Sequence, residues 1–303
     1  MKVLVAGGTG VIGQQLIPML IAEGYDAVAL ASSRTRAARL PVNTIVSNAL
    51  NSDAVATAVR RVAPDVVVHL LSAIPQRIRP RKFISDMSPT NRLRVEGTRN
   101  LLTAAPDARL ITQSVAFLYQ PLSGGLAAED RELWVDGPKP VRPVVHALKA
   151  AERLTLDAGG AVLRFGHLYG PETHLGWEGD FTEQVRAGRM PLVSSGSSVF
   201  SFTHTADAAG AIVAALGEEA TGIYNIVDDD PAPISTWLPE FAHILDAPRP
   251  RKVPGWAATL AGGSWGRAYL TSLTGADNSR ARDDLLWRPS WRSWRDGFRE
   301  MLG

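Results

Sequence analysis

The sequence predicts an α/β fold with a doubly wound parallel sheet and a smaller C-terminal lobe. Strand-like apolar segments alternate with amphipathic segments over the first 170 residues, a pattern typical of parallel sheets with right-handed crossovers. Residues 65–71 form an almost unbroken apolar run, of the kind that such sheets bury on both faces. The first strand begins at Val3 and runs directly into a glycine-rich turn.

That turn is the most informative motif in the chain. Glycine lets the backbone take positive φ and approach a pyrophosphate closely, and the helix that follows offers unpaired N–H groups. Both Gly7/Gly10/Gly13 and Gly8/Gly10/Gly13 fit the required spacing. The alternative is a glycine turn without a ligand, but the strand–turn–helix context favours a dinucleotide site. The expected contacts in this turn are Gly7, Thr9, Gly10, Val11, Ile12 and Gly13.

The elements after the turn follow in alternation. Apolar spacing predicts helices at 14–23, 53–62, 93–105 and 144–157. Apolar runs predict strands at 27–31, 44–46, 65–71, 108–112 and 161–165. Pro18 lies inside the first of these helices and is expected to kink it.

Beyond Gly170 the pattern loosens, and only 204–216 and 223–227 are expected to be regular. All tryptophans except Trp134 lie in this part, where most are expected to pack a small lobe and some could line a pocket for a flat ligand. We therefore assign residues 1–170 to a dinucleotide-binding domain, to which part of 200–230 returns. Residues 171–303 belong mainly to a substrate-binding lobe.

Composition excludes several classes of protein. The formal charge is only +2, so nucleic acid is not the expected partner, and the absence of cysteine excludes disulfides and thiolate chemistry. Acidic and histidine residues show no metal-ligand spacing, so no metal site is expected. No apolar leader precedes the first strand and no membrane span is expected, which predicts a cytoplasmic protein. We expect a monomer or homodimer acting on a small molecule.

The segment after the second strand predicts the cofactor. An acidic residue there would bind the ribose 2′-OH and repel a phosphate, but residues 32–36 carry only hydroxyls and arginines. Ser33 and Arg34 are therefore expected to bind the 2′-phosphate of NADPH or NADP, which makes NAD less favoured. The alternative is that these arginines merely begin a solvated helix. Leu71, Ser72 and Ala73, at the end of the fourth strand, are expected to contact the cofactor.

Six segments together resemble the extended short-chain dehydrogenase/reductase family, the relatives of nucleotide-sugar epimerases and dehydratases. They lie at 7–13, 65–70, 95–102, 163–171, 202–207 and 224–227. The resemblance spans nearly the whole chain and implies an NAD or NADP cofactor and a substrate cleft in the C-terminal lobe. It also implies an adenine contact at Asn48 and Ala49, where members of the family commonly have an aspartate.

The resemblance fails at the catalytic helix. Family members carry Tyr-x-x-x-Lys there; Lys149 matches the lysine, with Glu152 fixing the register, but Val145 stands at the tyrosine position. Lys149 is expected to contact the nicotinamide ribose. Ser114 matches the family serine and could bind a substrate oxygen, or it could simply end a strand. His146 could replace the tyrosine as an acid, but a step of one residue turns it about 100° around the helix, away from that position.

Two further polar residues carry structural expectations. His69 lies within an apolar strand and is expected to be a satisfied core histidine. Asp207 is expected to cap a helix over 208–216.

Three functions remain open. The favoured one is an NADPH-dependent ketoreductase of an aromatic polyketide-type ketone, in which a neighbouring phenol of the substrate supplies the proton. The chain resembles atypical family members of this type, the antibiotic-tailoring ketoreductases of the simocyclinone kind. A nucleotide-sugar epimerase or dehydratase-type enzyme is the first alternative, and a non-catalytic NADP-binding sensor or scaffold is the second.

Overall fold

The computed structural model describes residues 1–217 and 220–302, and it contains a seven-stranded sheet in the order β11-β6-β5-β4-β1-β2-β3. Every neighbouring pair in this sheet is parallel. The doubly wound parallel sheet predicted from the alternation is therefore confirmed. The strands are β1 (Lys2–Ala6), β2 (Asp26–Ala31), β3 (Asn43–Val46), β4 (Val66–His69), β5 (Arg109–Val115), β6 (Ala161–Phe165) and β11 (Gly222–Ile226).

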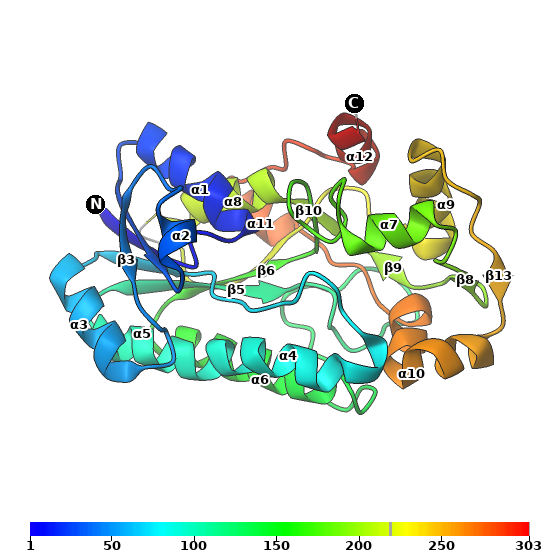
Figure 1. The fold of residues 1–303 in the computed structure, drawn as a ribbon, viewed down its shortest axis with the longest axis horizontal. Helices are drawn as coiled ribbons and strands as arrows, with labels where there is room; N and C mark the ends of the chain where they lie inside the picture. The colour runs from blue at the N-terminus through cyan, green and yellow to red at the C-terminus, as the bar shows by residue number, and fades with distance from the viewer. Residues whose placement is uncertain (218–219, 303) are drawn as a thin grey trace.

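Helices cover both faces of the sheet (Figure 1). One face carries α1 (Val11–Ala22), α8 (Thr205–Ala215) and α11 (Ser279–Asp284). The other carries α3 (Ser52–Val62), α4 (Phe83–Arg92), α5 (Thr98–Ala104) and α6 (Arg142–Asp157). A 3₁₀ turn over Pro80–Lys82 precedes α4, and a π-helical turn over Leu93–Gly97 joins α4 to α5. The short α2 (Arg34–Ala37) follows β2.

The C-terminal lobe lies at the carboxyl side of the sheet and is more regular than the sequence predicted (Figure 1). Its strands pair in twos: β7 (His167–Tyr169) with β10 (Phe202–His204), β8 (Leu192–Val193) with β13 (Lys252–Val253), and β9 (Val199–Phe200) with β12 (Ala232–Pro233). Its helices are α7 (Asp180–Arg186), α9 (Ile234–Ile244), α10 (Gly255–Thr271) and α12 (Trp294–Leu302).

These lobe elements escape sequence patterns for two reasons. The strands β8, β9, β12 and β13 have two residues each, too few to show a period. The longest lobe helix, α10, bends at Gly263, where φ is 70°. In the lobe Trp237, Trp265 and Trp294 are buried, as expected, whereas Trp256 is exposed. Along the described chain no helix is both long and apolar enough to cross a membrane.

The start of α8 corrects one expectation. The helix begins at Thr205, and the residue that caps it is His204, whose Nδ1 accepts a hydrogen bond from the Ala206 N–H at 3.2 Å. Asp207 lies within the first turn and instead accepts from the backbone N–H groups of Ser290 and Trp291, at 2.8 and 3.1 Å. Asp207 therefore anchors the C-terminal segment rather than capping α8.

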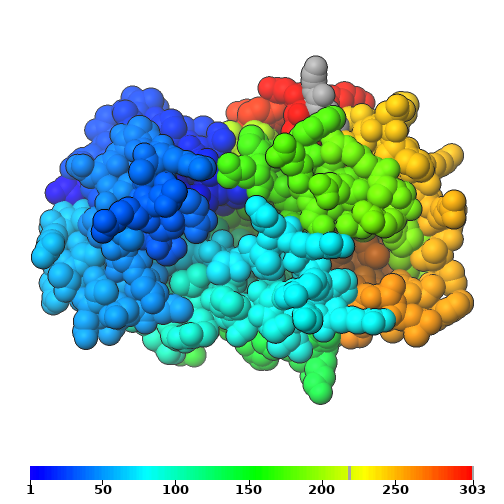
Figure 2. Space-filling model, in the orientation of Figure 1, coloured from blue at the N-terminus to red at the C-terminus, as the bar shows by residue number. Residues whose placement is uncertain are grey.

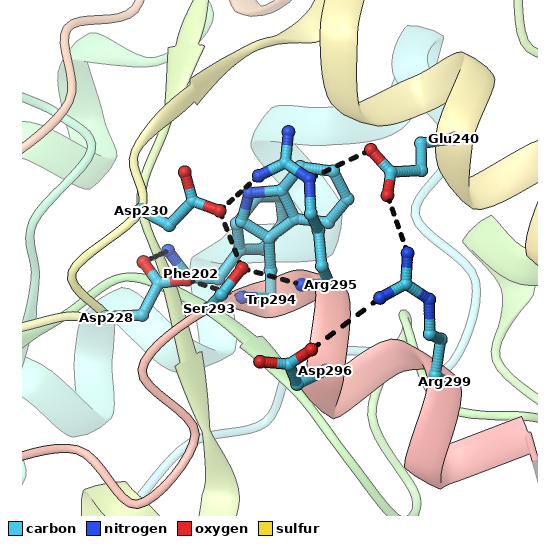
Figure 3. Close-up of polar contacts among 9 residues, drawn as sticks. All are labelled: Phe202, Asp228, Asp230, Glu240, Ser293, Trp294, Arg295, Asp296 and Arg299. Carbon is cyan, nitrogen blue, oxygen red and sulfur yellow. Dashed lines mark hydrogen bonds and ion pairs between the residues drawn. The ribbon is translucent and has the colours of Figure 1, made fainter.

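A second buried carboxylate anchors the C-terminal helix α12 (Figure 3). Asp228 accepts hydrogen bonds from the backbone N–H groups of Phe202, at 3.2 Å, and Trp294, at 2.9 Å. Arg295 reinforces the attachment through ion pairs to Asp230 and Glu240. The end of the chain is thus tied to β10 in the lobe by backbone donors that only a carboxylate at position 228 satisfies.

Asp228→Ala is expected to lower the free energy of unfolding by about 2–5 kcal/mol. The substitution leaves two buried N–H groups without acceptors, at about 1–3 kcal/mol each. Urea denaturation measures the change. Asp296→Ala is the matched control: its exposed carboxylate pairs with the exposed Arg299 at 3.6 Å, so the loss there should stay below about 0.5 kcal/mol. Equal stabilities of the two variants would contradict the anchoring role of Asp228.

Candidate active site

The turn after β1 has the geometry that requires glycine. Gly7 has φ of +95°, and a Cβ there would lie 2.7 Å from the carbonyl oxygen of Leu70. A Cβ on Gly13 would lie 2.6 Å from the backbone of Gly8, so strand and helix can only meet this closely without a side chain. A Cβ on Gly10 would come within 3.3 Å of the Gly7 oxygen. A Cβ on Gly8 would also be crowded, at 3.0 Å from the Ile17 side chain, so both glycine spacings fit the turn and only Gly7 adds a positive φ.

The helix that follows presents donors to the solvent. Gly10 is the N-cap of α1 and no side chain caps it, while the first intrahelical bond runs from the Gln14 N–H to the Gly10 oxygen at 3.0 Å. The N–H groups of Val11, Ile12 and Gly13 precede that bond and have no helical acceptor. With Gly10 exposed and Thr9 half-buried, the turn can take an anionic pyrophosphate. The residues present therefore fit a dinucleotide.

The segments at the carboxyl ends of β2 and β3 lie on the same edge of the sheet. Ser33 caps α2 and its Oγ accepts from the Arg36 N–H at 3.4 Å, and Arg34 is exposed at the start of that helix. Asn48 is exposed, but its Oδ1 already accepts from the Leu50 N–H at 3.0 Å.

Ala49 and the loop after β4 lie at the same carboxyl edge of the sheet. Ala49 is buried, and its carbonyl oxygen accepts from the Asn100 side chain at 2.9 Å. Ser72 and Ala73 are exposed, and the Ala73 N–H donates to the Thr90 hydroxyl at 3.0 Å. The carboxyl ends of β2 and β4 lie beside that of β1, because Ala6 pairs with Leu30 of β2 and with His69 of β4. The loops that follow these strands therefore lie next to the glycine turn.

The sequence predicts that His69 is a core histidine with its hydrogen bonds satisfied, and one of its two ring nitrogens is satisfied. Its Nδ1 accepts from the Leu71 N–H at 3.2 Å, while its buried Nε2 has no partner among the described residues. Burial lowers the pKa of His69 to about 4, so the ring is neutral at ordinary pH.

The helix α6 carries Val145, His146 and Lys149, the three residues expected at or beside the catalytic motif. Val145 is fully buried, while His146 is exposed on another side of the helix. Lys149 is also exposed, and its Nζ pairs with the Glu132 carboxylate at 2.7 Å. His146 therefore points away from the position of the missing tyrosine, and Lys149 is engaged by a loop carboxylate.

Ser114 belongs to a buried polar network. Its hydroxyl donates to Glu152 Oε1 at 2.6 Å, and Arg164 binds both oxygens of the same carboxylate, at 2.8 and 2.7 Å. Arg164 also donates to the hydroxyl of Tyr119 at 2.9 Å, and that hydroxyl donates to Asn225 Oδ1 at 2.5 Å. The Ser114 proton is thus held by a carboxylate, which gives no support to the expected contact with a substrate oxygen.

Aromatic rings form a wall at the junction of sheet and lobe. The ring of His167, just beyond the carboxyl end of β6, lies between Phe117 and Phe200, with centroids 4.3 and 4.2 Å away. Tyr269 of α10 contacts it edge-on at 5.6 Å. Phe117 and Tyr269 are only partly buried, so this wall offers flat apolar surface. The sequence drew attention to tryptophans instead, since nothing in it brings 117, 167 and 269 together.

The protonation of His167 follows from its contacts. Its Nδ1 lies 3.2 Å from the Ser201 carbonyl oxygen and must carry the proton. Nε2 is then an acceptor, and it has no hydrogen-bond partner in the part of the chain that the structure describes. Burial lowers the pKa of His167 to about 3. The ring is therefore neutral and serves as an aromatic surface and an acceptor, not as an acid.

The surface is hollowed where three parts of the chain meet (Figure 2). The blue N-terminal part, the cyan part and the green part surround this hollow. Two contacts join them: Gln14 Nε2 donates to Glu172 at 3.0 Å, and Arg77 pairs with Asp180 at 3.6 Å. The hollow adjoins the glycine turn, because Gln14 lies in the first turn of α1.

We expect the free energy of unfolding to decrease as the pH is lowered, because of His167. In the unfolded chain a histidine titrates near about 6.5, so between about pH 5.5 and about pH 4.5 only the unfolded state binds this proton. The wild type should therefore lose about 1.4 kcal/mol per pH unit more than His167→Phe, which keeps a stacked ring. Urea denaturation across this range measures both slopes, and equal slopes would contradict a neutral buried His167.

Comparison with known proteins identifies the family. Residues 3–227 match the model of the NAD dependent epimerase/dehydratase family. A 3-diazoavenalumate denitrifying reductase from a Streptomyces species is 42% identical over 309 residues, covering 98% of this chain and 99% of the relative.

Solved structures show the same fold. Human epimerase family protein SDR39U1, determined with NADPH, is 22% identical with a TM-score of 0.75, and the match covers 100% of this chain and 99% of that one. The dTDP-glucose 4,6-dehydratase DesIV from Streptomyces venezuelae, determined with NAD, is 23% identical with a TM-score of 0.77, covering 100% and 96%. The chain therefore belongs to the NAD dependent epimerase/dehydratase family of extended short-chain dehydrogenase/reductases, and it is an NAD(P)-dependent reductase.

Proposed function

We propose that this protein is an NADPH-dependent reductase that removes the diazo group of an aromatic compound as dinitrogen. The observation that carries the proposal is Val145, a fully buried aliphatic side chain where the family places its proton donor. The relative that is 42% identical over almost its entire length supports it, because its name describes reduction of a diazo compound with loss of nitrogen.

The chemistry of a diazo substrate suits a site without an acid. NADPH, when bound, supplies a hydride. A ketone that accepts a hydride becomes an alkoxide, which must then be protonated, and a general acid contributes about 10²–10⁴-fold in rate to such a step. An arenediazonium ion that gains a hydride and loses N₂ becomes a neutral arene, so charge and atoms balance without a proton. The product therefore needs no proton from a tyrosine.

The chain's own residues would bind and orient the reactants. The glycine turn and the N–H groups at the start of α1 would hold the pyrophosphate, and Arg34 would bind the 2′-phosphate. Val145 excludes water beside the reacting groups. The partly exposed rings of Phe117 and Tyr269 would stack with a flat aromatic substrate. Stacking would orient the substrate for hydride transfer.

The proposal changes the substrate that we expected from the sequence. The named relative favours a diazo group over the polyketide-type ketone, although both are aromatic substrates that could be reduced without the tyrosine. The UDP-glucose 4-epimerase from Thermotoga maritima and the dehydratase DesIV are 20% and 23% identical, and they indicate the fold alone. A cytoplasmic location and a monomeric or dimeric state stay predictions from the sequence.

Arg34→Ala is expected to weaken NADPH binding about 10–100-fold and to leave NADH binding unchanged, because a charge-assisted hydrogen bond contributes about 1.5–3 kcal/mol. Fluorescence titration with both nucleotides measures the two affinities. Arg61→Ala removes an exposed arginine at the end of α3 and serves as the control. Equal affinities of the wild type for NADPH and NADH would contradict the choice of cofactor.

The reaction itself can be tested with an arenediazonium salt and NADPH deuterated at the transferable position. We expect NADPH consumption to match N₂ release, with deuterium on the arene carbon that carried nitrogen. His146→Ala should keep turnover within about threefold of the wild type, since no general acid is needed. A loss of about 10²-fold or more in the folded variant would make His146 the acid. Turnover of aromatic ketones, with none of the diazonium salt, would overturn the proposed substrate.

A further inference from the structure

We propose that Arg94 binds an anionic group, a phosphate or a carboxylate, beside the glycine turn. The inference deepens the proposed function and rests on it, because the anion would belong either to the cofactor or to the substrate of that reductase. Three observations carry it: the place of Arg94 in the fold, the absence of a carboxylate partner among the described residues, and the contrast with Arg164, which is buried.

Arg94 lies in the π-helical turn Leu93–Gly97, which packs over the end of β4. A Cβ on Gly97 would lie 3.6 Å from the Leu71 side chain and 3.8 Å from His69 Nε2. Gly7 in turn approaches the backbone of Leu70 and Leu71, with its Cβ position 3.1 Å from the Leu71 nitrogen. The π-helical turn therefore lies against the loop after β4, and that loop lies against the glycine turn.

The guanidinium of Arg94 has a neutral partner. Its Nη1 donates to the side-chain oxygen of Asn91 at 3.2 Å, and among the described residues none of the ion pairs includes Arg94. The acid nearest in the chain, Glu96, is bound through both oxygens by Arg92, at 2.8 Å each. Burial lowers the pKa of Arg94 to about 10, as expected for a cation removed from water without a counter-ion.

Arg164 shows how this fold neutralises an arginine that serves structure alone. It is buried in the core and binds the Glu152 carboxylate through two nitrogens. Arg94 is half-buried and has no such carboxylate among the described residues, and a partly desolvated charge without a counter-ion destabilises the protein. An anion arriving with a ligand would offset that cost. Lys149, the cation expected near the nicotinamide ribose, is instead paired with Glu132 on the exposed side of α6.

The test replaces Arg94 by methionine, which keeps the length of the side chain and removes its charge. Arg92→Met is the matched control, because Arg92 is exposed on the same helical segment and pairs only with Glu96. Differential scanning fluorimetry gives the melting temperature of each ligand-free protein. We expect Arg94→Met to melt at or above the temperature of Arg92→Met, since it removes an uncompensated charge.

Two binding arms then distinguish the sources of the anion. If Arg94 binds a cofactor phosphate, Arg94→Met should bind NADPH at least about tenfold more weakly than Arg92→Met. If it binds a substrate carboxylate, NADPH affinity should be unchanged. The complex of the wild type with NADPH should then bind benzoate at least about tenfold more tightly than benzamide, and Arg94→Met should lose that preference.

Two results would overturn the assignment. One is an unchanged affinity for NADPH together with an unchanged benzoate preference. The other is a ligand-free Arg94→Met that melts well below Arg92→Met, which would make the arginine structural. Both arms measure binding, so an enzyme that fails to reduce diazo compounds would still test Arg94. A wild type that does not bind NADPH would overturn the proposed function before any variant is compared.

Discussion

The buried pair of Glu152 and Arg164 is the interaction on which the rest of the site depends. It joins α6 to β6, receives the Ser114 hydroxyl from β5, and extends through Tyr119 to Asn225 on β11. Removing one partner of such a pair destabilises a protein by about 3–5 kcal/mol, because the other charge stays buried. The network therefore fixes the rotation of α6, and with it which side chains of that helix are buried and which face solvent.

That rotation determines what chemistry the catalytic helix can perform. It buries Val145 and leaves His146 and Lys149 exposed, so a proton donor does not reach the place where the family has one. The same network holds the Ser114 proton on a carboxylate. A hydride acceptor that needs no proton would suit this arrangement, and for this reason we propose a diazo compound rather than a ketone as the substrate.

The C-terminal lobe depends on a comparable device just beyond the carboxyl end of β11. Two buried carboxylates, Asp207 and Asp228, each accept two backbone N–H groups, and together they tie the segment before α12 to α8 and β10. Figure 3 shows the contacts of Asp228. The aromatic wall around His167 is built on the same strand pair, β7 and β10. The shape of the C-terminal lobe is thus set by contacts between segments far apart in the chain.

The sequence by itself determined the parallel sheet, the glycine turn and the loss of the tyrosine. Each of these depends on a local signal: alternating apolar runs, glycine beside a strand, and a single residue at a fixed spacing. Only the tertiary structure decided that His204 rather than Asp207 caps α8, that Lys149 pairs with Glu132, and that the lobe contains two-residue strands. The physical reason is that these features depend on partners distant in the chain. The same holds for Arg94, which stands out because none of the ion pairs among the described residues includes it.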